Sequence, residues 1–269
     1  MQVYKDFIEL CPLSATFYGS YEVEDKYVHP ATQEYRILLS SLINKYKNSS
    51  FKYDEVFFYL MRLEENALKY PFHQIPVNHF VNPFKDILDI IDRFEFNQTG
   101  KGFDSFVTRI NKMISILPEL QYNMNQGILD GIVQNKTVIG ILIENLEHLD
   151  IKLDSIKRHK KKYKEFMNEA FLPAARKFAK SLKIDYLPYC KKTLGLYGFF
   201  SKDEQNSSAK SGTLTIQMYE HCLHYNVNYN ISYQQVFKLG IKLVSLYDRA
   251  IKEILPGIDL NVKYNLFKY

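Results

Sequence analysis

The densest group of potentially reactive side chains lies at residues 219–225, which read Tyr-Glu-His-Cys-Leu-His-Tyr. On a helix, Glu220 and His224 share one face, where they could chelate a cation. A metallopeptidase helix needs two histidines four residues apart, with a glutamate directly after the first. Here His221 and His224 are three residues apart, and a cysteine follows His221. We therefore predict neither a metal site nor a catalytic residue in this segment. Four of its side chains are instead expected to line a cleft: Tyr219, Glu220, His224 and Tyr225.

The other histidines give weaker signals. His73 and His79 lie six residues apart in a connection with three prolines, residues 71–83. Two histidines in a loop could bind a metal, but zinc requires further ligands, and none is apparent nearby. His148 and His159 fall on charged helical surface. We expect packing or surface roles for all four, and no metal or other cofactor in this chain.

One basic run is present at residues 157–162, Lys-Arg-His-Lys-Lys-Lys. It could bind phosphate groups. A site for single-stranded nucleic acid also needs aromatic side chains that stack on the bases, and none is interleaved with this run. Elsewhere acids and bases are interspersed, and the net charge is +5. A solvated helix face or a linker explains the run better, so we predict no nucleic-acid partner.

Composition indicates a folded globular protein, because 46% of the residues are hydrophobic and 24% are charged. Three cysteines, Cys11, Cys190 and Cys222, lie far apart and are expected to be free thiols. No stretch approaches the ~20 apolar residues of a membrane span. The N-terminus lacks the apolar core of a signal peptide. As written, the chain is expected to be cytoplasmic, and a signal upstream of Met1 would make it secretory.

Asn-X-Ser/Thr sequons would receive N-linked glycans only in the secretory case. Accidental sequons in an asparagine-rich chain are the other interpretation. The candidate sites are Asn48, Asn97, Asn135, Asn206 and Asn230.

Helical periodicity dominates the chain, and no sustained apolar–polar alternation indicates a strand. Capping residues and prolines set most of the expected boundaries. Asn82 followed by Pro83, Thr137 and Ser232 are expected to begin helices. Pro118 is expected to break a helix, and Pro173 to lie in a first turn or at a kink. We predict an all-α fold, an irregular array of roughly nine to eleven helices without a substantial sheet. The domain is expected to be a single unit, 1–269, with a possible division into 1–150 and 151–269. The expected helices are 2–10, 32–47, 53–70, 84–94, 104–116, 119–130, 137–149, one or two within 151–181, 187–196, 214–225 and 232–255.

The order of residues resembles the proteins that carry domain of unknown function 885, which are helical and related to gluzincin-type zinc metallopeptidases. The segment 12–19, with Pro12, Ala15-Thr16 and Gly19, resembles the family's opening pattern. The segment 103–146 resembles its most specific part, through Phe106 to Ile110, Leu117-Pro118 and Gly127 to Val133. Residues 74–78 and 219–244 resemble two further segments of the same family. Asn226-Val227 and Phe237 depart from the pattern, where the family often has His-Thr and His.

This resemblance covers the whole chain but only the N-terminal half of the family's length. It implies a non-catalytic helical portion of a zinc-dependent, carboxypeptidase-like enzyme, forming one wall of a substrate cleft. Zinc is expected only in a full-length parent, because the His-Glu-x-x-His helix is not in these 269 residues. The implied partner is a C-terminal catalytic half or a homologous subunit. The alternative is a stand-alone helical interaction or scaffold protein derived from the family, with a large apolar patch. An independent enzyme that uses Glu220, His221 and His224 is the least favoured hypothesis.

Overall fold

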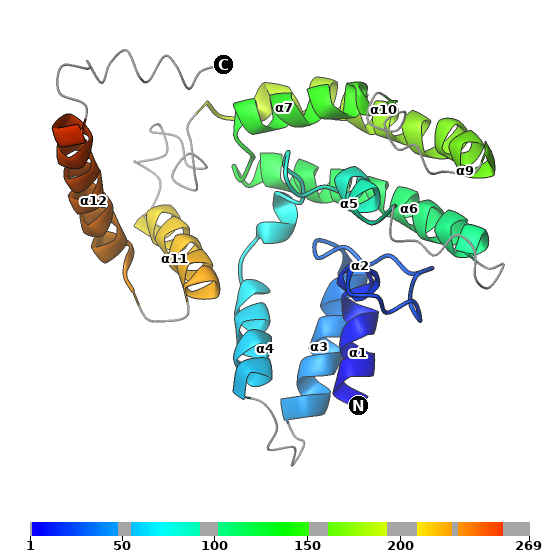
Figure 1. The fold of residues 1–269 in the computed structure, drawn as a ribbon, viewed down its shortest axis with the longest axis horizontal. Helices are drawn as coiled ribbons and strands as arrows, with labels where there is room; N and C mark the ends of the chain where they lie inside the picture. The colour runs from blue at the N-terminus through cyan, green and yellow to red at the C-terminus, as the bar shows by residue number, and fades with distance from the viewer. Residues whose placement is uncertain are drawn as a thin grey trace. The chain divides into compact units, whose positions relative to one another are not determined.

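The computed structural model contains helices as its regular secondary structure, with one isolated β-bridge between Asn135 and Lys191 (Figure 1). The prediction of an all-α fold without a sheet is therefore confirmed for the described part of the chain. The structure describes residues 2–47, 55–91, 102–150, 161–192, 209–227 and 231–254.

The chain divides into two compact units, Met1–Thr215 (unit 1) and Ile216–Tyr269 (unit 2). This boundary differs from the possible division after residue 150. Helices on either side of that position, α7 (Lys136–Glu147) and α10 (Leu172–Ser181), make the most extensive helix–helix packing in unit 1. Each unit is described separately below.

Four N-terminal helices begin unit 1: α1 (Gln2–Leu10), α2 (Pro12–Phe17), α3 (Gln33–Lys47) and α4 (Glu55–Ala67). Helices were predicted at 32–47 and 53–70 from their apolar periodicity, and the structure has α3 and α4 there. Helix α3 packs against α1 and α4. These contacts enclose a small apolar core formed by Leu10, Tyr35, Leu39, Leu42, Ile43, Tyr46 and Met61.

A single helix, α6 (Gly102–Leu129), runs through unit 1, so the predicted break at Pro118 is wrong. Proline inside a helix costs ~3 kcal/mol, because it lacks an N–H and its ring presses on the preceding turn. Pro118 is exposed, whereas Leu117 and Leu120 on either side are buried. Burying each leucine contributes ~1.5–3 kcal/mol. A continuous helix keeps both in the same core, which outweighs the local cost of the proline.

Helix α6 ends in a glycine-dependent turn. Gly131 has a φ of +72°, and its N–H donates to the Ile128 carbonyl at 3.3 Å. The Ile132 N–H donates to the Gly127 carbonyl at 2.7 Å, which completes a Schellman motif. A Cβ at Gly127 would lie 2.4 Å from the Ile132 carbonyl oxygen. Both glycines are therefore required by the backbone of this turn.

Residues 161–189 form one helical segment that widens before each of its prolines. Helix α9 (Lys161–Phe166) is followed by a π-helical turn, η3 (Met167–Phe171), and then by α10 with Pro173. A second π-helical turn, η4 (Leu182–Tyr186), precedes a 3₁₀ turn, η5 (Leu187–Tyr189), with Pro188. In each case the leucine before proline donates to a carbonyl five residues back, Leu172 to Met167 and Leu187 to Leu182. The wider turn relieves the contact between the proline ring and the preceding turn.

The prediction of a helix at 187–196 is wrong within the described residues, because Cys190 is already extended after η5. The main core of unit 1 lies between α6, α7, α10 and α5 (Pro83–Ile90). At its centre the Phe84 ring makes an edge contact with the Phe171 ring, with centroids 5.4 Å apart. A 3₁₀ turn, η1 (Phe72–Gln74), packs on α6.

Sequence capping signals are confirmed at two helices and wrong at a third. Asn82 caps α5 by accepting from the Lys85 N–H at 2.9 Å, with Pro83 in the first turn. Ser232 and Gln235 form a capping box at the start of α12 (Tyr233–Ile254). Helix α7 is capped by Asn135 rather than by the expected Thr137.

Candidate functional site

Unit 2 contains the segment whose side chains were expected to line a cleft. They lie on α11 (Ala209–Asn226), the helix predicted at 214–225. Tyr219 and Tyr225 are exposed, whereas Glu220 and His224 are half-buried. His221 is only 9% exposed, and its ring centroid lies 6.4 Å from that of Tyr225. These side chains therefore do not all face the same space.

The described residues do not fit a zinc ion. No three His, Cys, Asp or Glu side chains converge anywhere in the part of the chain that the structure describes. The three cysteines are free, and burial raises the pKa of Cys11 to about 11 and that of Cys190 to about 12. Burial also raises the pKa of Cys222, beside His221. Thiols that hold their protons in this way are poor nucleophiles and poor metal ligands.

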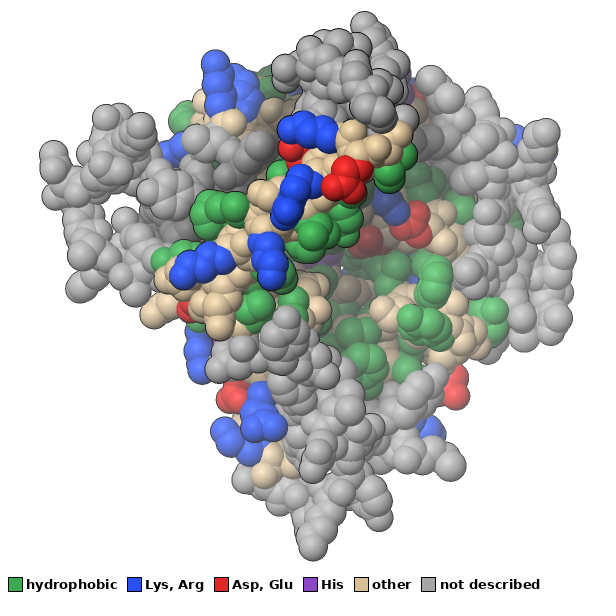
Figure 2. All heavy atoms as spheres, turned by 60° about the vertical axis from the view of Figure 1, so that its left-hand side comes forward, with side chains coloured by type: hydrophobic (Ala, Val, Ile, Leu, Met, Phe, Trp, Pro, Cys, Tyr) green, Lys and Arg blue, Asp and Glu red, His purple; other side chains and the backbone are tan. Residues whose placement is uncertain are grey.

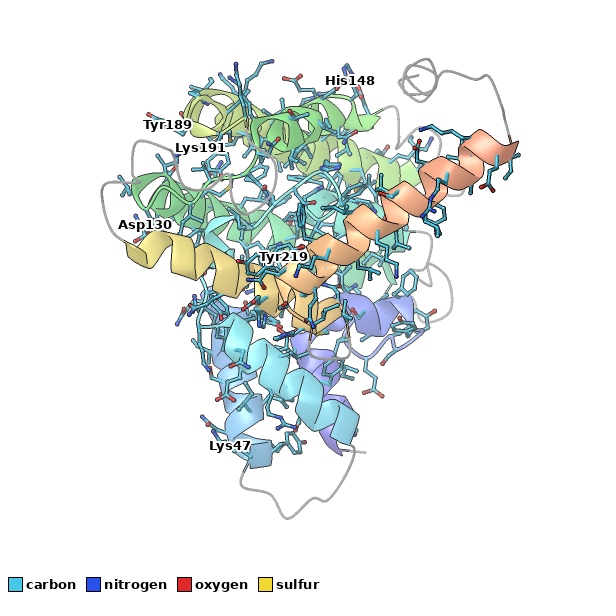
Figure 3. All side chains as sticks on the ribbon, turned by 90° about the vertical axis from the view of Figure 1, so that its left-hand side faces the viewer. Lys47, Asp130, His148, Tyr189, Lys191 and Tyr219 are labelled. Atoms are coloured by element: carbon cyan, nitrogen blue, oxygen red, sulfur yellow. The ribbon has the colours of Figure 1, made fainter. Side chains whose placement is uncertain are left out.

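One of the expected cleft residues does line a groove. Tyr219 of α11 (Figure 3) lines an open groove of about 950 Å³, and the other lining residues belong to the segment 233–245 of α12. Glu220, His224 and Tyr225 are not among its lining residues. The principal apolar side chains of the groove are Tyr219, Tyr233, Val236, Phe237, Ile241 and Val244.

Helix α12 is exposed along its whole length. None of its 22 residues is buried, although the helix carries many large hydrophobic side chains. Phe237 is 68% exposed, Val244 70% and Ile254 75%. In the space-filling view, hydrophobic side chains are exposed beside Lys and Arg (Figure 2). An apolar surface of this extent is typical of an interaction site. Sequence reasoning placed the helix correctly but did not identify this surface.

The charge on α12 is unevenly distributed. From Ile231 to Tyr247 the only charged residues are Lys238 and Lys242. The last two turns carry both signs, and Lys252 pairs with Asp248 at 2.7 Å. Lys238 is the one charged residue among those that line the groove. The groove therefore combines apolar walls with a positive edge.

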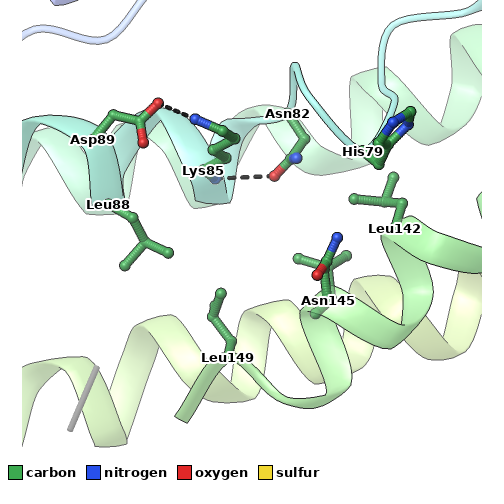
Figure 4. A pocket seen from close by; sticks show the side chains of 9 residues that line it. His79, Asn82, Lys85, Leu88, Asp89, Leu142, Asn145 and Leu149 are labelled. Atoms are coloured by element: carbon green, nitrogen blue, oxygen red, sulfur yellow. Dashed lines mark hydrogen bonds and ion pairs between the residues drawn. The ribbon is translucent and has the colours of Figure 1, made fainter. Parts of the chain in front are cut away.

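A second, smaller cavity of about 270 Å³ lies in unit 1 between α5 and α7 (Figure 4). Leu88, Leu142 and Leu149 form apolar walls, and His79 lies at one end. Lys85 lines the cavity but is held in an ion pair with Asp89, one turn further along α5. These charges neutralise each other, so the cavity has no strong preference for an anion or a cation.

Unit 1 also contains a fully buried arginine, which joins α6 to residues 12–23 near the N-terminus. Arg109 of α6 donates to the Thr16 hydroxyl at 2.9 Å and to the Val23 carbonyl at 2.5 Å. It lies 3.4 Å from the Pro12 carbonyl, to which Thr16 also donates at 3.0 Å. Burial lowers the pKa of Arg109 to about 10, so the group stays charged at neutral pH.

The other histidines and the basic run considered in the sequence analysis form no site together in the described residues. His73 Nδ1 lies 3.2 Å from the Arg36 guanidinium, and burial followed by this neighbouring charge lowers the pKa of His73. His148 is exposed at the end of α7. Lys162, at the end of the basic run, lies over the Phe103 ring at 4.3 Å. The first four residues of the run, 157–160, which include His159, lie outside the described residues.

Of the five sequons, only Asn135 falls within the described residues. It is 8% exposed, and its side-chain oxygen accepts from the Thr137 and Val138 N–H groups at 2.9 and 3.3 Å. Attachment of a glycan to this buried amide would require the first turn of α7 to open. Asn48, Asn97, Asn206 and Asn230 lie outside the described ranges.

Within the described ranges, no helix combines the length and the apolar character needed to cross a membrane. Comparisons of the chain with protein-family models, with curated proteins and with solved structures find no match.

Proposed function

We propose that this chain is a helical binding protein that contributes no catalytic centre of its own and joins another polypeptide through α12. The observation that carries this proposal is the exposure of the entire helix despite its many hydrophobic side chains. Leaving such side chains in water forgoes ~25 cal/mol for each Å² of apolar surface. A partner that covers α12 recovers this free energy.

The family resemblance suggests the nature of the partner, a zinc-peptidase catalytic portion. In that case the chain supplies one wall of a substrate cleft, and the metal comes entirely from the partner. This interpretation is supported by the buried cluster in which Arg109 contacts Thr16. The two residues belong to separate segments that resemble the family, and this buried hydrogen bond joins the two segments in the fold.

The alternative is a stand-alone scaffold that kept the helices and binds an unrelated protein or a homologous subunit. The same exposed helix supports it. Reading the transcript beyond the codon for Tyr269 separates the two. A His-Glu-x-x-His segment there assigns the chain to a peptidase, whereas a stop codon favours the scaffold.

The absence of catalysis is tested with the purified chain and a mixture of fluorogenic peptides. We expect no hydrolysis, with or without added zinc. Hydrolysis that a chelator abolishes and zinc restores would overturn the proposal.

The exposure of α12 is tested with the neutral dye Nile red, whose fluorescence rises on apolar surfaces. Val244→Asp is expected to reduce the signal, because a charge then lies in the middle of the apolar face. Lys242→Asp places the same side chain at a position that is already charged and serves as the matched control. Equal signals from both variants and the parent chain would show that the apolar face is covered.

A further inference from the structure

We infer that the cavity between α5 and α7 binds a small uncharged molecule with an aliphatic chain and an amide or hydroxyl group at one end. The site lies in unit 1 and is independent of the role proposed for α12. Four features of the cavity carry this inference: its size, its apolar walls, its polar side chains and the balance of charge at its edge.

The cavity has room for a molecule of modest size. Its volume is about 270 Å³. An apolar protein cavity of ~150 Å³ holds one benzene molecule, so a cavity of this volume holds about ten non-hydrogen atoms. Pockets for drug-sized ligands and cofactors usually exceed ~300 Å³. We therefore expect a ligand smaller than a nucleotide or a peptide.

Apolar side chains form one part of the cavity. Leu88 of α5 and Leu149, which follows α7, extend toward each other from opposite sides (Figure 4). Leu142 and Leu146 of α7 also line the cavity. The three leucines at positions 142, 146 and 149 are buried, so the main core holds this wall in place. A wall of leucines favours the alkyl part of a ligand, because contact with it removes apolar surface from water.

Asn82 provides a fixed hydrogen-bond donor at the cavity. Its side-chain oxygen accepts from the Lys85 N–H at 2.9 Å, and its Nδ2 donates to the Asn78 carbonyl at 3.1 Å. These two bonds hold the amide in one orientation. The amide makes no further hydrogen bond to the described part of the chain, so its second N–H is available to a ligand oxygen.

Asn145 extends from α7 toward Asn82 on the opposite side of the cavity (Figure 4). It lies three residues after Leu142 and directly before Leu146, among the apolar positions of the helix that line the cavity. Asparagine is one of the less favourable residues in a helix interior. Its side chain carries both a donor and an acceptor, which suit an amide or a hydroxyl group of a ligand.

His79 adds hydrogen-bonding capacity that the chain does not use. The imidazole makes no hydrogen bond to any residue that the structure describes, and its Nδ1 is buried. Most buried polar groups in proteins have a partner. A ligand group that both donates and accepts would give this ring one.

The charges at the edge of the cavity exclude an ionic ligand. Lys85 and Asp89 pair with each other, as the dashed line in Figure 4 shows. Neither a carboxylate nor an ammonium group of a ligand therefore finds an unpaired counter-ion on this part of α5. Because burying a charge without a counter-ion is unfavourable, the cavity selects an uncharged molecule.

The experiment uses the full chain and three probes with the same alkyl chain: octanamide, octanoate and octylammonium. Amide NMR signals from α5 and α7 report binding in the cavity, and signals from α12 report binding to the groove of unit 2. We expect octanamide to shift the α5 and α7 signals with a dissociation constant of ~1 mM. Either ion should bind there about tenfold more weakly.

Leu88→Trp tests the position of the site. The larger side chain fills the cavity, so octanamide should no longer shift the α5 and α7 signals. Leu129→Trp is the matched control, because Leu129 is 77% exposed and a larger side chain there extends into solvent. That control should bind octanamide as the parent chain does.

Asn145→Asp tests the chemistry of the site and does not depend on the folding of Leu88→Trp. It keeps the shape of the side chain but adds a negative charge, so octylammonium should become the tightest of the three probes. Asn66→Asp makes the same change on the exposed surface of α4 and should leave octanamide the tightest.

Equal affinity for the three probes, undiminished binding by Leu88→Trp or an unchanged order of affinities in Asn145→Asp would overturn the inference. Shifts confined to α12 would overturn it in favour of the exposed groove. All of these results leave the proposed function in place. That function fails separately, through peptide hydrolysis or a Nile red signal that Val244→Asp does not change.

Discussion

At the scale of single residues, a buried histidine makes unit 1 sensitive to mild acid. His29 is 3% exposed, and its Nδ1 accepts from the Ala31 N–H at 3.2 Å. Burial lowers its pKa from 6.5 to about 4, because the imidazolium would lose its hydration. The neutral ring is therefore part of the folded structure.

This shift predicts a loss of stability as the pH falls. Between pH 6.5 and about 4 the unfolded chain binds a proton that the folded chain does not, so folding weakens by up to ~3 kcal/mol. His29→Asn keeps an acceptor for the Ala31 N–H but does not titrate. Urea unfolding of the two proteins at a series of pH values checks this, and an equal acid dependence in both would contradict it.

The second residue-scale prediction concerns Arg109. Arg109→Met leaves the buried Thr16 hydroxyl and Val23 carbonyl without the donor that they have now. Each unsatisfied buried group costs ~1–3 kcal/mol, so we expect a destabilisation of about 3 kcal/mol. Thr16→Val removes one of these acceptors and should cost less. Thermal unfolding followed by circular dichroism measures both, and a fully stable Arg109→Met protein would show that the polar cluster is dispensable.

At the scale of the elements, residues that act locally were predictable. Asn82 with Pro83, and Ser232 with Gln235, begin their helices because a side chain satisfies N–H groups only a few positions away. Pro118 was misjudged because its local cost is offset by leucines that reach a core built from other helices. The π-helical turns before Pro173 and Pro188 were also missed, since no residue type specifies a turn of that width.

The same distinction, between features set by neighbouring residues and features set by distant helices, applies to the candidate site. Tyr219, one of the four residues expected to line a cleft, lies at the open groove on α12, whereas Glu220, His224 and Tyr225 are not among the residues that line it. Periodicity predicted the helix at 232–255 but assigned no role to its apolar face. Its exposure depends on which helices pack together, and periodicity alone does not contain that information.

The turn at the end of α6 gives an element-scale prediction. Gly131→Ala should destabilise unit 1 by ~1–2 kcal/mol, because an L side chain is strained at a φ of +72°. Gly131→Asn should cost less, since asparagine tolerates this conformation better than alanine. Chemical denaturation of the three proteins checks the order, and an alanine variant as stable as the parent would contradict it.

At the scale of the whole molecule, the two compact units predict different local stabilities. Helix α12 buries none of its residues, whereas α6 contributes ten buried residues to unit 1. Amide hydrogen exchange in α12 should therefore be at least about tenfold faster than in α6. Mass spectrometry of peptic fragments measures both.

Phe84→Ala should accelerate exchange in α6, because it removes a ring from the main core. It should not change exchange in α12, which lies in the other unit. Slow exchange in α12 of the free chain would indicate that the helix is already covered and would also argue against its availability to a partner.

The Arg109 cluster has a consequence for synthesis on the ribosome. The Val23 carbonyl and the Thr16 hydroxyl receive their donor from a residue 86 and 93 positions later in the chain. The first two helices can therefore be made long before the guanidinium that anchors them emerges from the exit tunnel. Nascent chains arrested before that point should be open to protease near their N-terminus, and longer ones should be protected there.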